Sequence, residues 1–290
     1  MKIFSLLLIL LVTAPVSNAQ VRKHKKKNST AVGTLFFYWG YNRSYYTHSN
    51  IRFIGPDYDF KLKDVVAYDR PDKFRANLYF NPATLTVPQY NARIGYYLRD
   101  KWAISFGVDH YKYVMADHNE VLLDGFIADG VDTTWAGNYD DEPVVTDRNK
   151  FHYENTNGVN FLRFELMRSF DLLEFGSQRQ VAFTGNIGAG LGPILTYNDL
   201  NFAQLHTIAT PSISGYGVGL NGSLRLEFFR HFFVAMESGL GLIHLVHVRT
   251  RPDDRDQFAR QKFGFSSYFA SAGVLIYLRP KNGCDSCPNW

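Results

Sequence analysis

The sequence has few of the features that stabilise or anchor many other classes of protein. Its 2 cysteines, Cys284 and Cys287, stand near the C-terminus, so no disulfide framework can support the rest of the chain. After the N-terminal segment, no apolar run reaches the ~20 residues that a membrane-spanning helix needs. With 16% aromatic residues, 4 methionines and a mean hydropathy of -0.21, the composition excludes a bundle of membrane helices.

Residues 1–19 have the organisation of a secretory signal. Met1-Lys2 gives a charged start, residues 3–12 are apolar, and Ser17-Asn18-Ala19 is a small-x-small cleavage site. We expect cleavage after Ala19, so that the mature chain starts at Gln20. Because no cysteine follows the cut, a lipoprotein anchor is not expected.

Residues 20–32 form a basic tail. The run Arg22-Lys23-His24-Lys25-Lys26-Lys27 supplies most of the formal net charge of +4. A solvated, disordered periplasmic tail is the first interpretation, and contact with phosphate-bearing lipid headgroups is the second. Nucleic acid is not an expected partner of an exported chain, and the net charge indicates no basic binding surface elsewhere.

Two long strand-like runs, 214–229 and 232–247, show the clearest pattern in the chain. Both alternate apolar and polar residues, and residues whose numbers sum to 460 share a face. One face carries leucines such as Leu224, Leu226 and Leu240, and the other carries glycines and a few charges. A soluble sandwich also alternates, but it seldom places charges on its narrower face. Such long alternating runs are typical of outer-membrane barrels.

The same alternation recurs and predicts an all-β, eight-stranded antiparallel transmembrane β-barrel within residues 33–279. Long and short connections alternate strictly, as expected for extracellular loops and periplasmic turns. Pairing of 51–60 with 61–67 would raise the count to ten, and the apolar alternation there predicts a folded cap or strand extensions above the membrane. The predicted strands are 33–45, 89–99, 102–113, 158–172, 180–197, 214–229, 232–247 and 263–278, and the long connections are 48–87, 116–157, 198–211 and 249–262.

Seven polar residues are predicted to form one cluster in the lumen. An eight-stranded barrel is just wide enough for its own side chains, so a filled interior is expected. The charges nearly balance, as burial requires, and Asp109 is a diagonal neighbour of Arg93, as Glu237 is of Arg225. A satisfied plug is the favoured interpretation, and a gated polar channel or proton-coupled site is the alternative. The cluster comprises Arg93, Asp109, Arg163, Glu165, Arg225, Glu227 and Glu237.

Weak catalytic candidates lie where the strands meet the outer loops. A lipid A hydrolase would need a serine nucleophile, a base and an orienting acid at this level. His48, Ser49, His110 and Asp109 are the candidates, with Asp57 as a second acid. Adjacent strand residues point to opposite faces, so His48 could activate Ser49 only across a turn.

No metal or cofactor is predicted. His118, His152 and nearby aspartates lack the ligand spacing of a zinc site, and the four aspartates within 57–69 do not match an EF-hand loop. The aspartates within 57–69 are interpreted as parts of solvated turns. Cys284 and Cys287 are predicted to form a small periplasmic disulfide loop, because a thioredoxin-type motif would begin a helix.

Four segments, 48–65, 88–97, 109–114 and 152–160, resemble an outer-membrane β-barrel family of the Bacteroidota. They begin with His48-Ser-Asn-Ile-Arg-Phe, Pro88-Gln-Tyr-Asn-Ala-Arg, Asp109-His-Tyr-Lys and His152-Tyr-Glu-Asn. The resemblance spans most of the mature chain and implies the fold and location but no activity. The layout is more distantly similar to eight-stranded OmpA-like and lipid A deacylase barrels. The deacylase pattern places His and Ser two residues apart on one strand, and no convincing pair of this kind is present.

These observations predict a structural or surface-binding protein of the bacterial outer membrane with a plugged lumen and a C-terminal periplasmic tail at 280–290. The alternatives are a lipid A-modifying hydrolase and passage of small hydrophobic ligands. Outer-membrane lipids and lipopolysaccharide are the expected partners. The barrel-assembly and periplasmic chaperone machinery is expected to bind during biogenesis.

Overall fold

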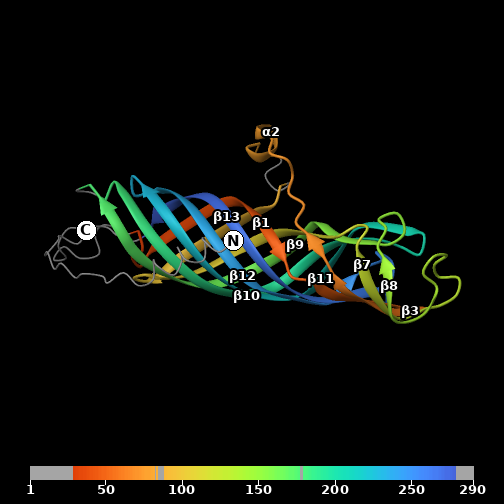
Figure 1. The fold of residues 1–290 in the computed structure, drawn as a ribbon. Helices are drawn as coiled ribbons and strands as arrows, with labels where there is room; N and C mark the ends of the chain where they lie inside the picture. The colour runs from red at the N-terminus through yellow and green to blue at the C-terminus, as the bar shows by residue number, and fades with distance from the viewer. Residues whose placement is uncertain (1–28, 82, 84–87, 177–178, 279–290) are drawn as a thin grey trace. The chain divides into compact units, whose positions relative to one another are not determined.

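Eight antiparallel strands form a closed ring in the computed structural model, which describes residues 29–81, 83, 88–176 and 179–278 (Figure 1). Pairing of the first ring strand with the last closes the ring, so the predicted eight-stranded barrel is confirmed. Among the described residues, no helix is long and apolar enough to cross a membrane. The ring consists of β1 (Thr34–Tyr46), β5 (Tyr90–Arg99), β6 (Trp102–Met115), β9 (His152–Phe175), β10 (Val181–Phe202), β11 (Leu205–Phe228), β12 (Phe232–Arg249) and β13 (Phe258–Tyr277).

The β11–β12 hairpin has the register expected from its alternation. Gly215 pairs with Leu245 and Arg225 with Ala235, so the numbers of paired residues sum to 460. Arg225 is buried, whereas Leu224 is 56% exposed on the opposite face. A shift of one residue would reverse both faces. The polar face therefore lines the lumen, and the leucines lie outside.

Apolar side chains cover the outside of the ring between two aromatic girdles. On β6, Trp102 lies at the periplasmic girdle, and His110, stacked on Tyr90, lies at the outer one. The stretch of β6 between them is roughly 20 Å tall, close to the ~25 Å apolar band of outer-membrane barrels. This belt makes the ring a transmembrane barrel of the outer membrane. It includes Ile94, Ile104, Phe106, Phe164, Leu166, Leu191, Leu220, Leu240 and Leu242.

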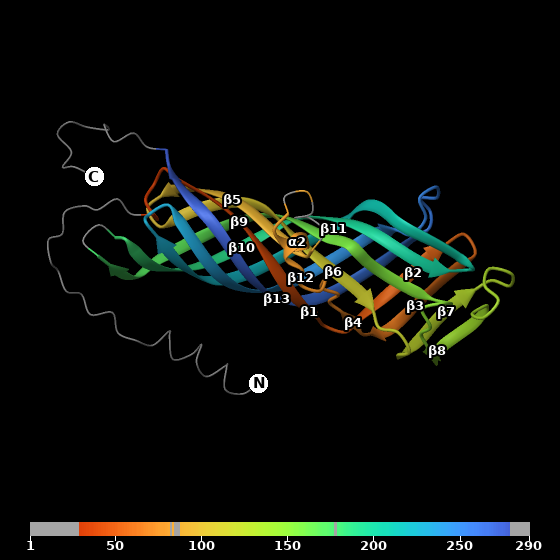
Figure 2. The ribbon, with the colours of Figure 1, turned by 90° about the horizontal axis from the view of Figure 1, so that it is seen from above.

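The barrel continues well beyond the outer girdle. β9 and β11 each have 24 residues, about twice the ~9–11 that cross a bilayer. Additional strands lie at one end of the ring, and helix α2 (Ala76–Tyr79) stands out from its side (Figure 1 and Figure 2). The predicted strand extensions within 48–87 are confirmed, and the long connection predicted at 116–157 contains a hairpin. The additional strands are β2 (Ser49–Gly55), β3 (Tyr58–Val65), β4 (Ala67–Tyr68), β7 (Glu120–Ile127) and β8 (Gly137–Val145). We call these strands, with the outer ends of β6 and of β9 to β13, the extracellular extension.

The long loop predicted at 198–211 is wrong, because β10 and β11 remain paired as far as Phe202 and Leu205. The turn between them consists of Ala203 and Gln204, with φ angles of 56° and 57°. A turn with two positive φ values matches the twist of the strands it joins, and Asn-Gly or Asp-Gly normally signals it. Ala-Gln carries no such signal.

β2 and β4 continue the wall where β1 and β5 end. β1 pairs with β13 up to Phe265, and β2 pairs with residues 258–262 of the same strand. β5 pairs with β6 up to Asp109, and β4 pairs with β6 at Val114 and Met115. The hairpin of β2 and β3 therefore forms, as the ten-strand alternative required. It lengthens the barrel outward and leaves the membrane ring at eight strands.

An apolar core fills the extracellular extension. Phe53 and Phe60 stack with ring centroids 5.2 Å apart, and Phe151 packs edge-on against Phe53 at 5.1 Å. Aromatic pairs of this geometry add to the hydrophobic stabilisation of burial. The core also includes Ile51, Leu62, Val65, Tyr113, Leu123, Tyr153, Phe161, Phe202, Leu245 and Phe263.

Candidate functional site

The lumen within the membrane contains a network of buried charges. Arg93 forms ion pairs with Asp109 and, at 2.9 Å, with Glu165. Arg163 lies 2.9 Å from Glu165 and 3.7 Å from Asp109. All four side chains are at most 1% exposed. Two cations share two carboxylates, so the charges of these four buried side chains balance.

A second charged cluster lies nearer the periplasmic end. Arg225 lies 2.8 Å from Glu227, and this carboxylate also accepts hydrogen bonds from Ser29 and Thr184 at 2.9 Å. Arg179 pairs with Glu227 at 3.4 Å. Sequence reasoning missed Ser29 and Arg179, because both lie outside the alternating strands from which the lumen residues were read.

Glu237 is a diagonal neighbour of Arg225 in the register but forms no ion pair with it in the described structure. It accepts a 3.4 Å hydrogen bond from the phenol of Tyr38. The guanidinium of Arg225 lies over the ring of Phe233, 5.2 Å from its centroid, and pairs with Glu227 on its own strand. Arg225 therefore pairs with Glu227, two positions further along its own strand, and not with its diagonal neighbour on β12.

His48 and Ser49 point to opposite faces. Nδ1 of His48 lies 2.8 Å from an Asp64 carboxylate oxygen at the surface. The buried Ser49 hydroxyl lies 3.0 Å from the Tyr113 hydroxyl and accepts a 3.0 Å hydrogen bond from the Gln261 amide. Across the residues described, no serine hydroxyl is hydrogen-bonded to a histidine. The candidates therefore do not form a nucleophile–base pair.

The other catalytic candidates are also separated. Asp109 belongs to the lumen network, whereas His110, its neighbour on β6, faces outward with Nδ1 2.7 Å from Oδ1 of Asn160. Asp57 is exposed at the turn between β2 and β3. The wall of the barrel therefore lies between His110 and Asp109.

The histidines considered as metal ligands lie against local carboxylates. Nε2 of His152 lies 2.8 Å from Glu154, and Nδ1 of His118 lies 3.1 Å from Asp117. Within the described ranges, no group of three His, Cys, Asp or Glu side chains is placed to hold a metal ion. The signal at 1–19, most of the basic tail, and Cys284 with Cys287 lie outside the described residues.

The wall has a seam where the ladder between β5 and β6 has ended. There the Asn42 amide donates to the carbonyl of His110 at 3.1 Å, and the backbone N–H of Ser44 donates to the Asp69 carboxylate at 2.9 Å. Burial raises the pKa of the Asp69 carboxyl above its ordinary value, although the Ser44 hydrogen bond opposes the shift. Side chains and loop groups thus close the seam in place of a strand ladder.

A polar pocket of about 590 Å³ lies on the outer wall beside this seam. The segment that follows β4 supplies one side of it, and the outer ends of β6 and β9 supply the other. Nζ of Lys112 lies 2.6 Å from Asp72, and Arg70 lies 3.6 Å from Glu154. No sequence pattern joins these segments, so the pocket was not predicted. Its lining includes Arg70, Asp72, Lys73, His110, Lys112 and Thr156.

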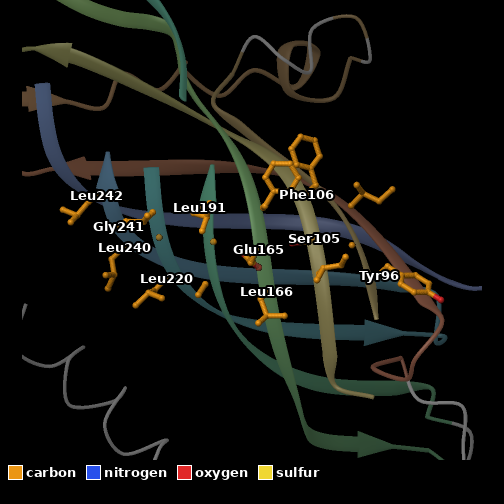
Figure 3. Close-up of a pocket in the computed structure, with 18 of the residues that line it drawn as sticks. Tyr96, Ser105, Phe106, Glu165, Leu166, Leu191, Leu220, Leu240, Gly241 and Leu242 are labelled. Carbon is orange, nitrogen blue, oxygen red and sulfur yellow. The ribbon is translucent and has the colours of Figure 1, made fainter. Parts of the chain in front are cut away.

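A second depression, of about 980 Å³, lies on the lipid-facing wall. Figure 3 shows Leu166, Leu191, Leu220 and Leu240, which come from the successive strands β9 to β12. Each of these leucines is more than half exposed. Such a surface suits lipid acyl chains and forms part of the apolar belt.

Comparisons with solved structures find outer-membrane barrels. OprG from Pseudomonas aeruginosa is 9% identical with a TM-score of 0.40, covering 87% of this chain and 100% of its own. Ail of Yersinia pestis is 11% identical with a TM-score of 0.32, covering 84% and 99%. The N-terminal barrel of Pseudomonas aeruginosa OprF is 8% identical with a TM-score of 0.28, covering 84% and 98%. No protein-family model and no curated protein matches the chain.

Proposed function

We propose that the protein is a non-enzymatic outer-membrane protein whose filled barrel anchors a rigid, partner-binding extracellular extension. The filling of the barrel interior carries this proposal. Arg93, Arg163 and Tyr97 occupy the lumen within the membrane, and Phe53 and Phe60 occupy the extension, each at most 1% exposed. Close packing of this kind favours anchoring and rigidity over conduction.

The outermost hairpin, formed by β7 and β8, supplies the binding chemistry in this proposal. Residues 117–147 contain nine Asp or Glu residues and no Lys or Arg. Lys63, on β3, pairs with Asp124 at 3.1 Å and also with Asp141. The excess of carboxylates over this single lysine favours a cationic partner by charge complementarity.

The free edge of β8 favours recognition through side chains. β8 pairs with β7 and ends the strand order of the sheet. Pro143 and the acidic run Asp140-Asp141-Glu142 lie on this edge strand, where proline and charge hinder the addition of another strand. We therefore expect a partner that contacts the acidic side chains.

Titration of the full chain in nanodiscs with a decalysine peptide tests the binding surface. The triple variant D140N/D141N/E142Q should bind about tenfold more weakly, and added salt should weaken wild-type binding. The control D253N/D254N/D256N removes three carboxylates from the connection between β12 and β13 and should bind like wild type. Equal affinity of all three proteins would contradict the assignment.

The two alternative functions have separate tests. A lipid A hydrolase would alter the mass spectrum of lipid A when the protein is expressed, and we expect no change. Passage of small hydrophobic ligands would accelerate their uptake into liposomes that contain the barrel, and we expect the rate of protein-free liposomes. A changed lipid A profile or accelerated uptake would overturn the anchoring proposal without bearing on the acidic surface.

A further inference from the structure

The polar pocket lies at the level of the outer aromatic girdle. His110, which lines the pocket, is the last of three stacked rings on neighbouring strands. Trp39 and Tyr90 have centroids 4.7 Å apart, and Tyr90 and His110 have centroids 5.2 Å apart. Aromatic rings at this height mark the boundary between acyl chains and headgroups. The pocket is therefore at the height of the outer-leaflet headgroups.

Cations outnumber anions in the pocket lining. Three cations, Arg70, Lys73 and Lys112, accompany one carboxylate, Asp72, which gives a net charge of +2. Asp72 is already paired with Lys112 at 2.6 Å. Arg70 reaches Glu154 only at 3.6 Å, and Lys73 makes no ion pair within the part of the chain that the structure describes. Two exposed cations thus border the cavity with little compensation.

The segment that carries Arg70 and Lys73 also carries exposed aromatic rings. Phe74 is 68% exposed and Phe80 is 71% exposed. Between them Tyr79 is buried, with its ring centroid 4.7 Å from that of Tyr41 on β1. Figure 1 shows α2, which ends at Tyr79, standing out from the side of the barrel. Exposed aromatic rings beside cations are the composition of a segment that lies in the membrane interface.

We propose that this pocket binds the phosphate group of an anionic lipid in the outer leaflet. Arg70 and Lys73 supply charge-assisted hydrogen bonds to the phosphate oxygens, and Lys112, held by Asp72, adds a positive charge. The cavity of about 590 Å³ exceeds the volume of a phosphate, so part of the headgroup enters as well. The acyl chains then lie along the apolar belt. The site does not depend on the surface-binding function proposed above.

Native mass spectrometry of the full chain in mild detergent, with diphosphoryl lipid A as the probe, tests this site. The double variant R70Q/K73Q should bind lipid A about tenfold more weakly than wild type, because it loses two charged donors. Both side chains are exposed, so the thermal midpoint of unfolding should stay at its wild-type value. The matched control K150Q/R255Q removes two exposed extracellular cations that do not line the pocket.

The control variant K150Q/R255Q and inorganic phosphate as a competitor test whether lipid A binds at this pocket. The control should keep wild-type affinity within about twofold, because its cations do not contact the lipid. An equal loss in both variants, or no loss in R70Q/K73Q, would overturn the site. Inorganic phosphate distinguishes a lipid from a soluble ligand, and it should not displace lipid A at equimolar concentration. Binding of inorganic phosphate as tightly as lipid A would overturn the lipid assignment.

Discussion

The phenol of Tyr46 donates a 2.9 Å hydrogen bond to the backbone carbonyl of Lys112. These residues belong to β1 and β6, and the bond crosses the seam above the β5 ladder. Asn42 makes the equivalent bond to the carbonyl of His110 at 3.1 Å. Side chains of β1 thus complete the hydrogen bonding of β6 where the wall passes from the membrane ring to the extracellular extension.

Replacement of Tyr46 by phenylalanine should weaken this seam. The carbonyl of Lys112 loses its donor inside the wall, which costs about 1–3 kcal/mol. We expect a lower free energy of unfolding in urea and faster amide exchange at residues 110–113. Tyr45→Phe is the matched control, because the Tyr45 side chain is 66% exposed on the other face of the same strand. Equal exchange rates in the two variants would refute the bridging role.

The apolar core of the extracellular extension should depend on Phe53. Phe53→Ala removes a ring that contacts Phe60, Phe151 and Tyr153, and truncation of a buried phenylalanine costs about 3–5 kcal/mol. Limited trypsin digestion should then cut the extension while the membrane ring stays protected. Phe126→Ala, at a ring that is 44% exposed on β7, should leave the digestion pattern unchanged.

Loss of a single cation from the lumen network should destabilise the folded barrel. Arg93→Met leaves Asp109 and Glu165 with Arg163 as their remaining arginine partner, and breaking a buried ion pair costs about 3–5 kcal/mol. The variant should unfold at a lower temperature in heat-modifiability gels. Arg99→Met, at an exposed position beside the periplasmic turn, should match wild type. A stable Arg93→Met protein would show that the network contributes little to folding.

The membrane ring could be predicted from the sequence because its constraint is local. Lipid outside and a filled lumen inside impose an alternation with a period of two. The pattern of one hairpin was therefore enough to predict that Arg225 faces the lumen and Leu224 faces outward. The same alternation assigned all seven lumen residues to the interior, where the structure places them. The alternation did not predict which of these charges form ion pairs. Arg225 pairs with Glu227 on its own strand and not with its diagonal neighbour Glu237.

The β7–β8 hairpin of the extracellular extension, the turn between β10 and β11, and the pocket could not be predicted in the same way. Outside the bilayer the wall is not held to one alternation, and strands such as β2 and β4 extend ladders begun by β1 and β5. The turn at Ala203 and Gln204 lacks the usual residues. Arg70 and Lys112 are far apart in sequence and meet only because the seam brings the segment after β4 against β6.

The hairpin of β2 and β3 carries an ion pair with a predictable response to pH. Nε and Nη2 of Arg52 donate to the two carboxylate oxygens of Asp59 at 2.7 and 2.5 Å. The hydrogen bonds from Arg52 hold the pKa of the Asp59 carboxyl below its ordinary value, although partial burial opposes the shift. Both groups are partly exposed, so the pair contributes at most about 1 kcal/mol.

Because the pKa of Asp59 is lower in the folded hairpin than in the unfolded chain, the ion pair stabilises the hairpin above the unfolded pKa. The contribution is lost as the pH falls through the lowered folded pKa. In Arg52→Met the pKa of Asp59, followed by the carboxyl carbon shift in NMR, should rise toward its ordinary value, and the acid-induced increase in amide exchange across residues 51–62 should diminish. Arg255→Met, which removes an exposed cation from the connection between β12 and β13, should leave the titration of Asp59 unchanged. If Asp59 titrates identically in all three proteins, Arg52 does not control its ionisation, and the pair is a contact without an energetic role.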